Sequence, residues 1–406
     1  MDTHTDSAHV DVAIDVAVVG AGPTGLLLAG ELATRGIRVA VLERALVPDI
    51  SPKGNGIVGR ASVKLAKLGV FAGTGLKPIR PPRFQFGPLP LRLGFGPWNP
   101  LHILPIPQRR LEELLERRAL DHGAELRRGQ EVVDFQQTEA GVEVEVLVGS
   151  TTRRVQARYL VGCDGARSMV RKRAGIEFSG FTSDEISRIA RVTIPAGRIS
   201  RAGESFDIPG VGRVAAMRPN RLQGGGFSIA PAHALDPSAP DDLYLVSTHE
   251  PRADAGPEET LTTEGLRASL RRVLGADLPF TEATAVRSTV GNSRLADAYR
   301  AGRVFLAGDA AHIFNAGGSS LNVGLQDALE LAARLAALLR GGESQDELDG
   351  YEQVRRPAGK AALQHTRAQA ALGRDDDNGR ALREIMGELL AAPSAARRLA
   401  RLIENP

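Results

Sequence analysis

The sequence offers almost nothing for covalent or metal cross-linking. Cys163 is the only cysteine among 406 residues, which excludes an internal disulfide and a cysteine-based metal site. The acidic run Asp375–Asp377 lacks the spacing of a calcium loop, so we predict no metal centre. Because Cys163 ends the apolar segment YLVGC, we interpret it as a buried, unreactive thiol, with a reactive thiol as the alternative.

Aromatic side chains, strong net charge and long apolar runs are also scarce. Only 4% of residues are aromatic and the formal net charge is +3, with arginines alternating with acidic residues as in RRLEELLERRA, so we expect no nucleic-acid partner. The best candidate for a membrane span, LELAARLAALL, is short and interrupted by Arg334, so we expect none. The stretch MDTHTDSAHVD is polar and acidic, unlike a signal peptide, and we therefore expect a cytoplasmic protein.

Residues 12–44 have the pattern of a strand, a turn, a helix and a second strand. VAIDVAVVG is an apolar run rich in β-branched residues, and IRVAVLER resembles it. Between them, AGPTGLLLAGELATRG places apolar residues at helical spacing and ends at Gly36, a typical helix C-terminus. This βαβ unit implies parallel strands and an α/β fold.

The residue pattern of the chain changes after the βαβ unit. Residues 76–107 contain nine prolines and show no helical periodicity, which predicts extended segments. From about 178 to 286, segments such as RIARVTI, GGFSIAP and LYLVSTHE are separated by turn residues, which predicts an antiparallel sheet in a second domain. From Asn322 onward the chain is rich in alanine and is predicted to be helical.

The segment VVGAGPTG contains Gly20, Gly22 and Gly25 in the spacing G-x-G-x-x-G, after a strand and at the start of a helix. Gly20 permits a tight turn, Gly22 lets the backbone approach a pyrophosphate, and Gly25 lets the helix pack on the strand. Glu43 ends the next strand, 18 residues beyond Gly25, close to the spacing expected for a carboxylate that binds ribose hydroxyls. The segment predicts a site for the ADP part of NAD or FAD, and a glycine-rich turn without a ligand is the alternative.

Two further apolar strands each end in an aspartate next to a glycine, in VGCDGARS and VFLAGDAAH. Asp164 and Asp309 can each accept a hydrogen bond from a ribose or ribityl hydroxyl, while the glycine gives a ligand close access. Taken singly, each segment is an ordinary turn. Two such turns favour a long ligand held along its length, and FAD fits this better than a mobile nicotinamide.

The segments GAGPTG…LER, GCDGARS and GRVFLAGDAAH…GG…LNVGLQDA, in this order, resemble the single-component FAD-dependent aromatic hydroxylases, the para-hydroxybenzoate hydroxylase group that includes hydroxylases tailoring polyketide antibiotics. The resemblance covers about residues 12–360. It implies a Rossmann-like FAD-binding domain with an inserted, mostly antiparallel substrate domain and C-terminal helices. We assign residues 1–75, 101–177 and 287–345 to the FAD-binding domain, 76–100 and 178–286 to the substrate-binding domain, and 346–406 to a C-terminal helical segment.

The resemblance also carries cofactor-binding roles to matching positions. The ADP part of FAD would lie against Gly20, Gly22, Pro23, Thr24, Gly25, Glu43 and Arg44. Lys53 stands where the family usually has an arginine near the flavin, and Gln108 matches a glutamine beside the ribityl-phosphate region. Asp164 is linked to the use of both FAD and NAD(P)H, and Asp309, after Gly308, would bond to the ribityl or ribose part. The flavin ring would lie at a helix N-terminus, whose positive end stabilises negative charge on the reduced ring, against Gly317, Gly318, Leu321 and Asn322.

The loop HIFNAGGSSLN departs from the family pattern H-x-x-P-P-x-G-G-Q-G-x-N. It is one residue shorter, lacks proline, and has Ser319-Ser320 in place of Gln-Gly. In the family this loop borders the site of oxygen chemistry, so the change bears on oxygen activation and substrate fit. Asn315 brings a hydrogen-bonding side chain there and is the one candidate catalytic residue. His312 lies within the FAD turn, and we interpret it as structural.

The function implied by the resemblance is that of an FAD-dependent, NAD(P)H-consuming monooxygenase. It would hydroxylate an aromatic or polyketide-type small molecule with O₂ through a flavin C4a-hydroperoxide, with NADPH or NADH as the transient reductant. The alternatives are an epoxidase or Baeyer–Villiger enzyme on the same scaffold, a flavin reductase or dehydrogenase that does not activate oxygen, and a non-catalytic flavin-binding protein. The sequence leaves open whether the protein is a monomer or a homodimer.

The substrate pocket is expected between the two domains, over the flavin. The candidates for its lining are Phe84, Trp98, Met217, Phe227 and Phe314, with core packing as the alternative role for the aromatic ones. The scarcity of charge near these segments favours a large apolar aromatic substrate over a small acid.

Overall fold

The first sheet is parallel at its centre and carries the predicted βαβ unit. The computed structural model describes residues 14–49, 53, 56–234, 238–253, 262–315, 319–341, 348–374 and 376–404. Strand β1 (Ile14–Val19) pairs in parallel with β2 (Val39–Glu43) on one side and β10 (Thr151–Gly162) on the other, and helix α1 (Pro23–Thr34) connects β1 to β2. Because β1 sits where the strand order reverses, the crevice at the carboxyl ends of β1 and β10 is the expected place for a ligand.

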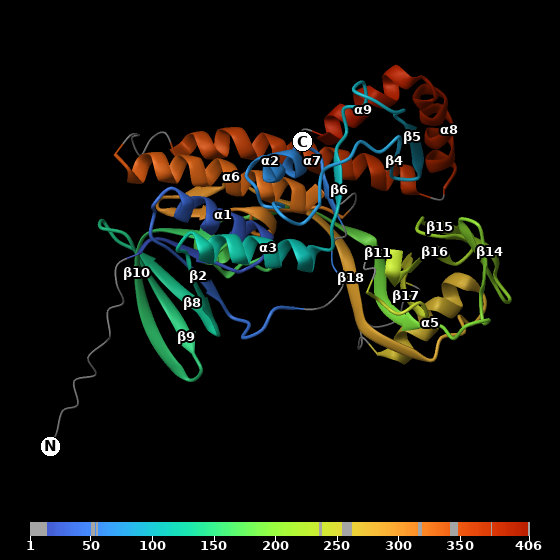
Figure 1. Cartoon of the computed structure of the whole chain (residues 1–406), viewed down its shortest axis with the longest axis horizontal. Coiled ribbons are helices and arrows are strands. Elements are labelled where there is room, and N and C mark those ends of the chain that lie inside the picture. The colour runs from blue at the N-terminus through green and yellow to red at the C-terminus, as the bar shows by residue number, and fades with distance from the viewer. Residues whose placement is uncertain are drawn as a thin grey trace.

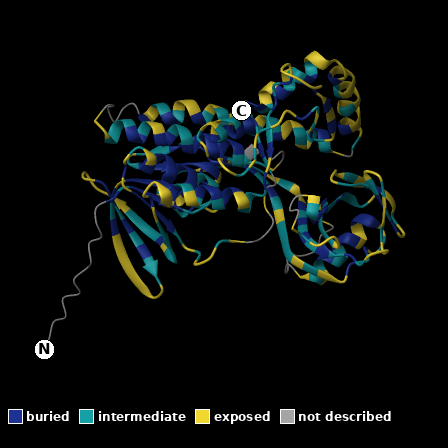
Figure 2. Cartoon of the chain, viewed as in Figure 1, coloured by how far each residue is buried: buried dark blue, intermediate teal, exposed yellow. Residues whose placement is uncertain are grey.

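The order along this sheet is β19–β20–β10–β1–β2–β7, and β9 joins β8 to β10. The apolar, β-branched residues of β1 and β2 are almost completely buried, as expected for strands covered on both faces (Figure 2). The remaining strands are β7 (Glu125–Arg128), β8 (Gln130–Gln137), β9 (Val142–Val148), β19 (Arg300–Ala301) and β20 (Val304–Leu306).

The second sheet is antiparallel and lies beside the first, on the right in Figure 1. Its long strands β11 (Phe178–Thr193) and β18 (Glu282–Ala296) run from the first sheet toward a separate core, in which helix α5 (Thr263–Leu274) packs on the sheet. The antiparallel sheet predicted within residues 178–286 is therefore confirmed. The other strands are β15 (Asn220–Leu222), β16 (Gly225–Pro231), β17 (Leu243–Pro251) and β21 (His312–Ile313), with β12 (Ser200–Ala202), β13 (Ser205–Ile208) and β14 (Gly212–Ala215) in a small neighbouring sheet.

The proline-rich segment forms a hairpin of β4 (Arg83–Phe86) and β5 (Leu89–Arg92). Its apolar side chains Phe86, Leu89 and Leu91 share a third core with the C-terminal helices. The turn at Gly87 packs on Gln369, whose side-chain oxygen accepts a 3.1 Å hydrogen bond from the Gly87 N–H. The hairpin therefore packs on helices of the segment 346–406, because alternation along each strand turns its apolar side chains toward those helices. The division into domains stays a prediction.

Most of the helices lie along the parallel sheet, while α8 and α9 lie at the upper right of Figure 1 and α5 lies against the second sheet. Besides α1 and α5 the helices are α2 (Arg60–Lys67), α3 (Gln108–Asp121), α4 (Met169–Arg173), α6 (Ser319–Leu339), α7 (Asp349–Gly373), α8 (Asp377–Ala391) and α9 (Pro393–Glu404). There are also two short 3₁₀ turns among the described residues, η1 (Ala232–Ala234) and η2 (Gly308–Ala310). Strands β3 (Gly56–Val58) and β6 (Ile103–Pro105) form a small separate pair. In the described ranges, none of these helices is long and apolar enough to cross a membrane.

Candidate functional site

A large cavity opens at the carboxyl ends of β1, β10 and β20. It has a volume of about 1370 Å³, and its wall continues from the start of α1 to the β4–β5 hairpin and the second sheet. Pockets for one small ligand usually measure ~300–1,000 Å³. The cavity therefore has room for a cofactor and a second molecule.

The glycine-rich turn has the geometry that its spacing predicts. Gly20 has a φ of +103°, and a side chain there would lie 2.5 Å from the carbonyl oxygen of Cys163. Gly25 has no room either, because a Cβ would lie 2.1 Å from the Gly20 oxygen. A Cβ on Gly22, by contrast, would meet no atom within 4 Å, although Gly22 lines the cavity. Pro23 and Thr24 follow it in the first turn of α1 and also line the cavity, so the turn leaves an open approach to the helix N-terminus.

Glu43 braces this turn from the end of β2. Its two carboxylate oxygens accept hydrogen bonds from the backbone N–H groups of Ala21 and Ala45, each at 2.8 Å. A carboxylate can accept about four hydrogen bonds, so ribose hydroxyls can still bind to Glu43. The neighbouring Arg44 is exposed.

Asp164 follows β10 and caps the short helix α4. Its Oδ2 accepts hydrogen bonds from the N–H groups of Met169, at 2.7 Å, and Val170, at 3.1 Å. Its Oδ1 is buried and has no hydrogen-bond partner within the described part of the chain. The residues on either side, Cys163 and Gly165, line the cavity. Burial, with the charges of Asp164 and Asp327, raises the pKa of the Cys163 thiol well above its usual range, which favours the unreactive interpretation.

Asp309 lies in η2 at the end of β20, and its side chain is exposed to the cavity. The surrounding protein still desolvates the carboxyl group and raises its pKa, against the opposing charges of His312 and Lys53. The preceding Gly308 has a φ of +64°, and a Cβ there would lie 2.6 Å from Thr24 Oγ1. The start of α1 and the turn after β20 therefore meet at van der Waals distance.

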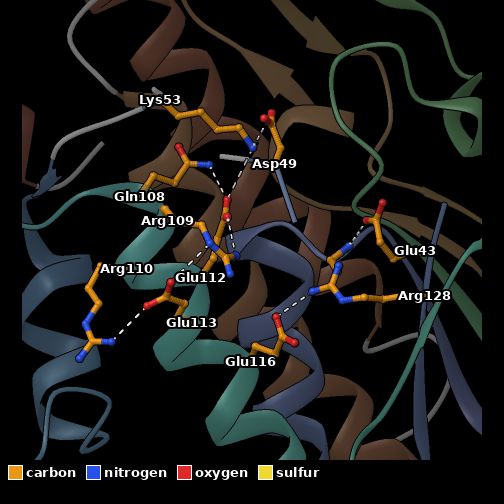
Figure 3. A network of polar contacts seen from close by, with 11 residues as sticks. Glu43, Asp49, Lys53, Gln108, Arg109, Arg110, Glu112, Glu113, Glu116 and Arg128 are labelled. Atoms are coloured by element: carbon orange, nitrogen blue, oxygen red, sulfur yellow. Dashed lines mark hydrogen bonds and ion pairs between the residues drawn. The ribbon is translucent and has the colours of Figure 1, made fainter. Parts of the chain in front are cut away.

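Lys53 and Gln108 meet at a buried glutamate on α3, which Figure 3 shows from close by. Gln108 Nε2 donates a 2.9 Å hydrogen bond to Glu112 Oε1, and Lys53 Nζ lies 3.8 Å from the same oxygen and 3.5 Å from Asp49 Oδ2. Lys53, Gln108 and Glu112 all line the cavity. The arrangement holds a lysine ammonium at the wall between two carboxylates.

The loop before α6 contains the departure from the family pattern. The N–H of Phe314 donates a 2.9 Å hydrogen bond to Ser320 Oγ, and the N–H of Asn315 donates a 3.0 Å bond to Ser293 Oγ. Asn322 Oδ1 accepts a 2.6 Å bond from the Val58 N–H and so ties α6 to β3. Leu321 lines the cavity, whereas the predicted flavin contacts Gly317 and Gly318 lie outside the described residues.

A buried ionic network lies behind this wall. Asp327 of α6 accepts hydrogen bonds from Arg355 Nε of α7 at 2.7 Å and from the Gly308 N–H at 3.2 Å, and its Oδ2 lies 2.6 Å from His312 Nε2. Burial acts to raise the pKa of Asp327, but the charge interactions and hydrogen bonds with His312 and Arg355 have the larger effect, so the net pKa is lowered. Because Asp327 is held ionised, His312 donates to it, and this fits the structural role predicted for His312.

Three of the five predicted substrate-lining residues border the cavity: Phe84, Met217 and Phe314. Trp98 and Phe227 are not among the described lining residues. Trp98 is 75% exposed, in the loop after β5. Phe227 is completely buried in the core that contains α5, because alternation along β16 turns it to that face of the sheet.

The residues present fit FAD. The open approach at Gly22 suits a diphosphate, the unpartnered Asp164 Oδ1 suits a hydroxyl donor, and Asp309 supplies a further acceptor along the same wall. Sequence reasoning missed Asp327 and Arg355, which lie 28 positions apart and meet because α6 packs on α7. It also missed four arginines in the cavity wall, Arg83, Arg92, Arg218 and Arg287, so the expected scarcity of charge there is wrong. In RFQFGPLPLR, apolar residues alternate with other residues on both sides of the Gly-Pro turn. This alternation is the signal that could have placed Arg83 and Arg92 on one face of a hairpin.

Comparison with known proteins identifies similar chains. The family described as FAD binding domain matches residues 13–366. A 12-dehydrotetracycline 5-monooxygenase/anhydrotetracycline 6-monooxygenase from Streptomyces rimosus is 38% identical over 396 residues, covering 96% of this chain and 76% of that protein. A dialkyldecalin synthase from Streptomyces rugosporus is 32% identical over 398 residues, covering 96% of this chain and 79% of that protein. The solved structure of an aromatic hydroxylase from angucycline biosynthesis matches with a TM-score of 0.82 and 30% identity, covering 96% of this chain and 76% of that chain.

Proposed function

The chain belongs to the FAD-binding domain family, and we propose that it acts as an FAD-dependent monooxygenase that hydroxylates a polycyclic aromatic compound of the polyketide type, with NADPH or NADH as reductant. One observation carries this proposal. A single cavity of about 1370 Å³ runs from the start of α1 to the hairpin and the second sheet, so that a cofactor and a large second ligand can meet inside it. Phe84, Met217 and Phe314 give its far part an apolar surface suited to a flat ring system.

The chain's own residues bind and orient the reactants. The first turn of α1 offers free N–H groups and a positive dipole end to a diphosphate, and Glu43 holds that turn in place. Asp164 and Asp309 accept hydrogen bonds from sugar and ribityl hydroxyls. Asn322 fixes the start of α6 against β3, so the positive end of a 21-residue helix is held at the cavity.

The chemistry that FAD supplies when bound is acceptance of a hydride from the nicotinamide and activation of O₂ toward an electron-rich ring. The protein's contribution is to exclude water and to aim the ring, and this requires no acid–base pair of side chains. Asn315 stays a candidate for a polar contact near the flavin ring, and it is not among the described residues that line the cavity. Its side chain packs over Gly291 of β18, where an added Cβ would overlap it.

The test is the visible absorption spectrum of the purified protein before and after anaerobic addition of NADPH or NADH. We expect a flavin spectrum that bleaches and recovers in air, with faster bleaching and substrate-coupled O₂ uptake in the presence of a polycyclic phenol. Incorporation of ¹⁸O from O₂ into a phenolic product identifies hydroxylation, whereas an epoxide or an inserted ester oxygen identifies the other oxygenation reactions. Absence of flavin after incubation with FAD would contradict the proposal.

A second candidate is a protein on this scaffold that binds FAD and does not activate oxygen. The changed loop, Asn315 to Ser320, favours it, because that loop borders the site of oxygen chemistry in the family. In that case the flavin is reduced, but O₂ uptake does not respond to any aromatic acceptor and no ¹⁸O enters the product.

A further inference from the structure

The cavity wall formed by the β4–β5 hairpin and the second sheet is strongly basic. Arg83 and Arg92 line the cavity from the β4–β5 hairpin, and Arg218 and Arg287 line it from the chain around the second sheet. The acids among the described lining residues are Glu112 and Asp309, and both belong to the wall around Lys53 and the predicted cofactor site. Positive and negative charge are therefore separated along one cavity.

Arg83 and Arg92 are directly opposite each other in the hairpin. Side chains at opposite positions leave the sheet on the same face, with Cβ atoms about 5 Å apart, and like charges placed this way destabilise the pair. Neither guanidinium has a hydrogen bond or ion pair to any other residue in the described ranges. Gln85 is the next residue on the same face of the hairpin and also lines the cavity, while Phe86, Leu89 and Leu91 on the opposite face pack against the C-terminal helices. Two uncompensated cations aimed into a cavity are an arrangement that a bound anion would stabilise.

The facing wall is also built in an unusual way. Met217 has a φ of +57°, a left-handed conformation that costs free energy for any residue other than glycine. Its N–H donates a 2.8 Å hydrogen bond to the Ile229 carbonyl, which holds the turn against β16. This turn brings the next residue, Arg218, to the cavity wall, where its guanidinium also forms a 3.1 Å ion pair with the exposed Glu204.

We propose that Arg83 and Arg92, with Arg218 and Arg287 on the facing wall, bind an anionic group of the aromatic acceptor, such as a carboxylate or an ionised phenol or enol. Guanidinium groups bind planar anions in two-point fashion, so they orient the ring as well as hold it. The acceptor is then a large aromatic acid and not a neutral hydrocarbon. This inference rests on the proposed function in one respect: it takes the bound anion to belong to the aromatic molecule that the enzyme hydroxylates.

The test is isothermal titration calorimetry of the oxidised, FAD-loaded protein with 1-hydroxy-2-naphthoate and with 1-hydroxy-2-naphthamide, which differ in charge. We expect the naphthoate to bind about tenfold more tightly at low salt, with the preference shrinking as salt is added. Arg83→Gln and Arg92→Gln should each weaken naphthoate binding by about fivefold and leave naphthamide binding unchanged, since these are partly solvated charges. Arg83→Lys should keep part of the preference. The matched control is Arg153→Gln, an exposed strand arginine on β10, which should change neither.

Thermal unfolding separates a binding role from a structural one. Because the two arginines repel each other, Arg83→Gln should leave the Tm of the ligand-free protein unchanged or slightly raised. Equal affinity for the naphthoate and the naphthamide overturns the proposal, as does an acid preference that survives in the Arg83→Gln/Arg92→Gln double variant. A lowered Tm in Arg83→Gln also counts against it.

The 2′-phosphate of NADPH is the other source of the same anionic chemistry. If the double variant raises the KM for NADPH and not for NADH while naphthoate binding is unaffected, the arginines serve the coenzyme and the proposal is overturned. Failure of the proposed function looks different. Naphthoate preference would persist, while NAD(P)H-driven O₂ uptake would be absent.

Discussion

Gly22→Ala should abolish tight FAD binding while leaving the fold intact. The backbone at Gly22 has a φ of −77° and a ψ of 177°, which alanine adopts without strain, and a Cβ there meets no protein atom within 4 Å. Alanine is a poorer N-cap than glycine by up to about 1 kcal/mol, but it also restricts the unfolded chain by about 0.4–1 kcal/mol. These effects offset each other, so the apoprotein should unfold at nearly the wild-type temperature.

The added methyl group lies instead in the space through which a diphosphate reaches the helix N-terminus. Losing two charge-assisted N–H bonds, each worth about 1.5–3 kcal/mol, should weaken FAD binding by about 3 kcal/mol or more, which is on the order of 100-fold in Kd. Gly25→Ala should behave in the opposite way. Its Cβ would lie 2.1 Å from the Gly20 oxygen, and forcing α1 off β1 should cost about 1–3 kcal/mol and lower the Tm.

The assay combines titration of apoprotein with FAD, followed by flavin fluorescence, with thermal unfolding of the apoprotein. The control is Gly387→Ala in α8, another glycine whose Cβ meets nothing within 4 Å. It should raise stability by up to about 1 kcal/mol and leave the FAD affinity unchanged. The reasoning is refuted if Gly22→Ala binds FAD as tightly as the wild type, or if it lowers the apoprotein Tm as much as Gly25→Ala.

Three other changes test the site. Asp309→Asn should raise the apoprotein Tm at neutral pH and not in acid, because desolvation raises the pKa of Asp309 in the folded protein. The destabilisation by the carboxylate therefore begins above the unfolded-state pKa of about 3.9 and is complete above the raised folded value. The substitution should also weaken FAD binding, and a lowered Tm at neutral pH would contradict this reasoning. Asp327→Asn leaves the buried Arg355 without a counter-charge and should cost about 3–5 kcal/mol in chemical denaturation, with part of the loss recovered by adding Arg355→Met. Asp349→Asn, by contrast, removes the exposed partner of Arg300 and should cost less than about 1 kcal/mol. Because the pKa of Asp327 is lowered in the folded protein, its stabilisation is complete above an unfolded-state pKa of about 3.9 and is lost as the pH falls through the lower folded value; a wild-type advantage that grows in acid would be inconsistent with this sign. Cys163 should react with iodoacetamide far more slowly than free cysteine and more slowly still with FAD bound, and fast labelling of the holoprotein would show that the thiol is not protected.

Much of the fold follows from short-range patterns. The run of β-branched residues in β1, the glycines at 20, 22 and 25 and the cap at Gly36 predict the βαβ unit, because strand and helix periodicity are local properties. The antiparallel sheet within residues 178–286 was predictable for the same reason. The hairpin at residues 83–92 was expected only as extended chain, and its packing on the C-terminal helices was not predicted, because no local signal records which distant helix covers a strand.

The site residues divide in the same way. The sequence by itself determined the glycine-rich turn, Glu43 and the two aspartates at strand ends, since each depends on spacing within a few residues of a turn. Only the tertiary structure decided that Asp327 pairs with Arg355 and His312, that Phe227 turns into a core, and that Arg83 and Arg92 point with Arg218 and Arg287 into one cavity. Burial, charge pairing and the lining of a cavity depend on which surfaces meet when the elements pack, and no local pattern in the sequence records that.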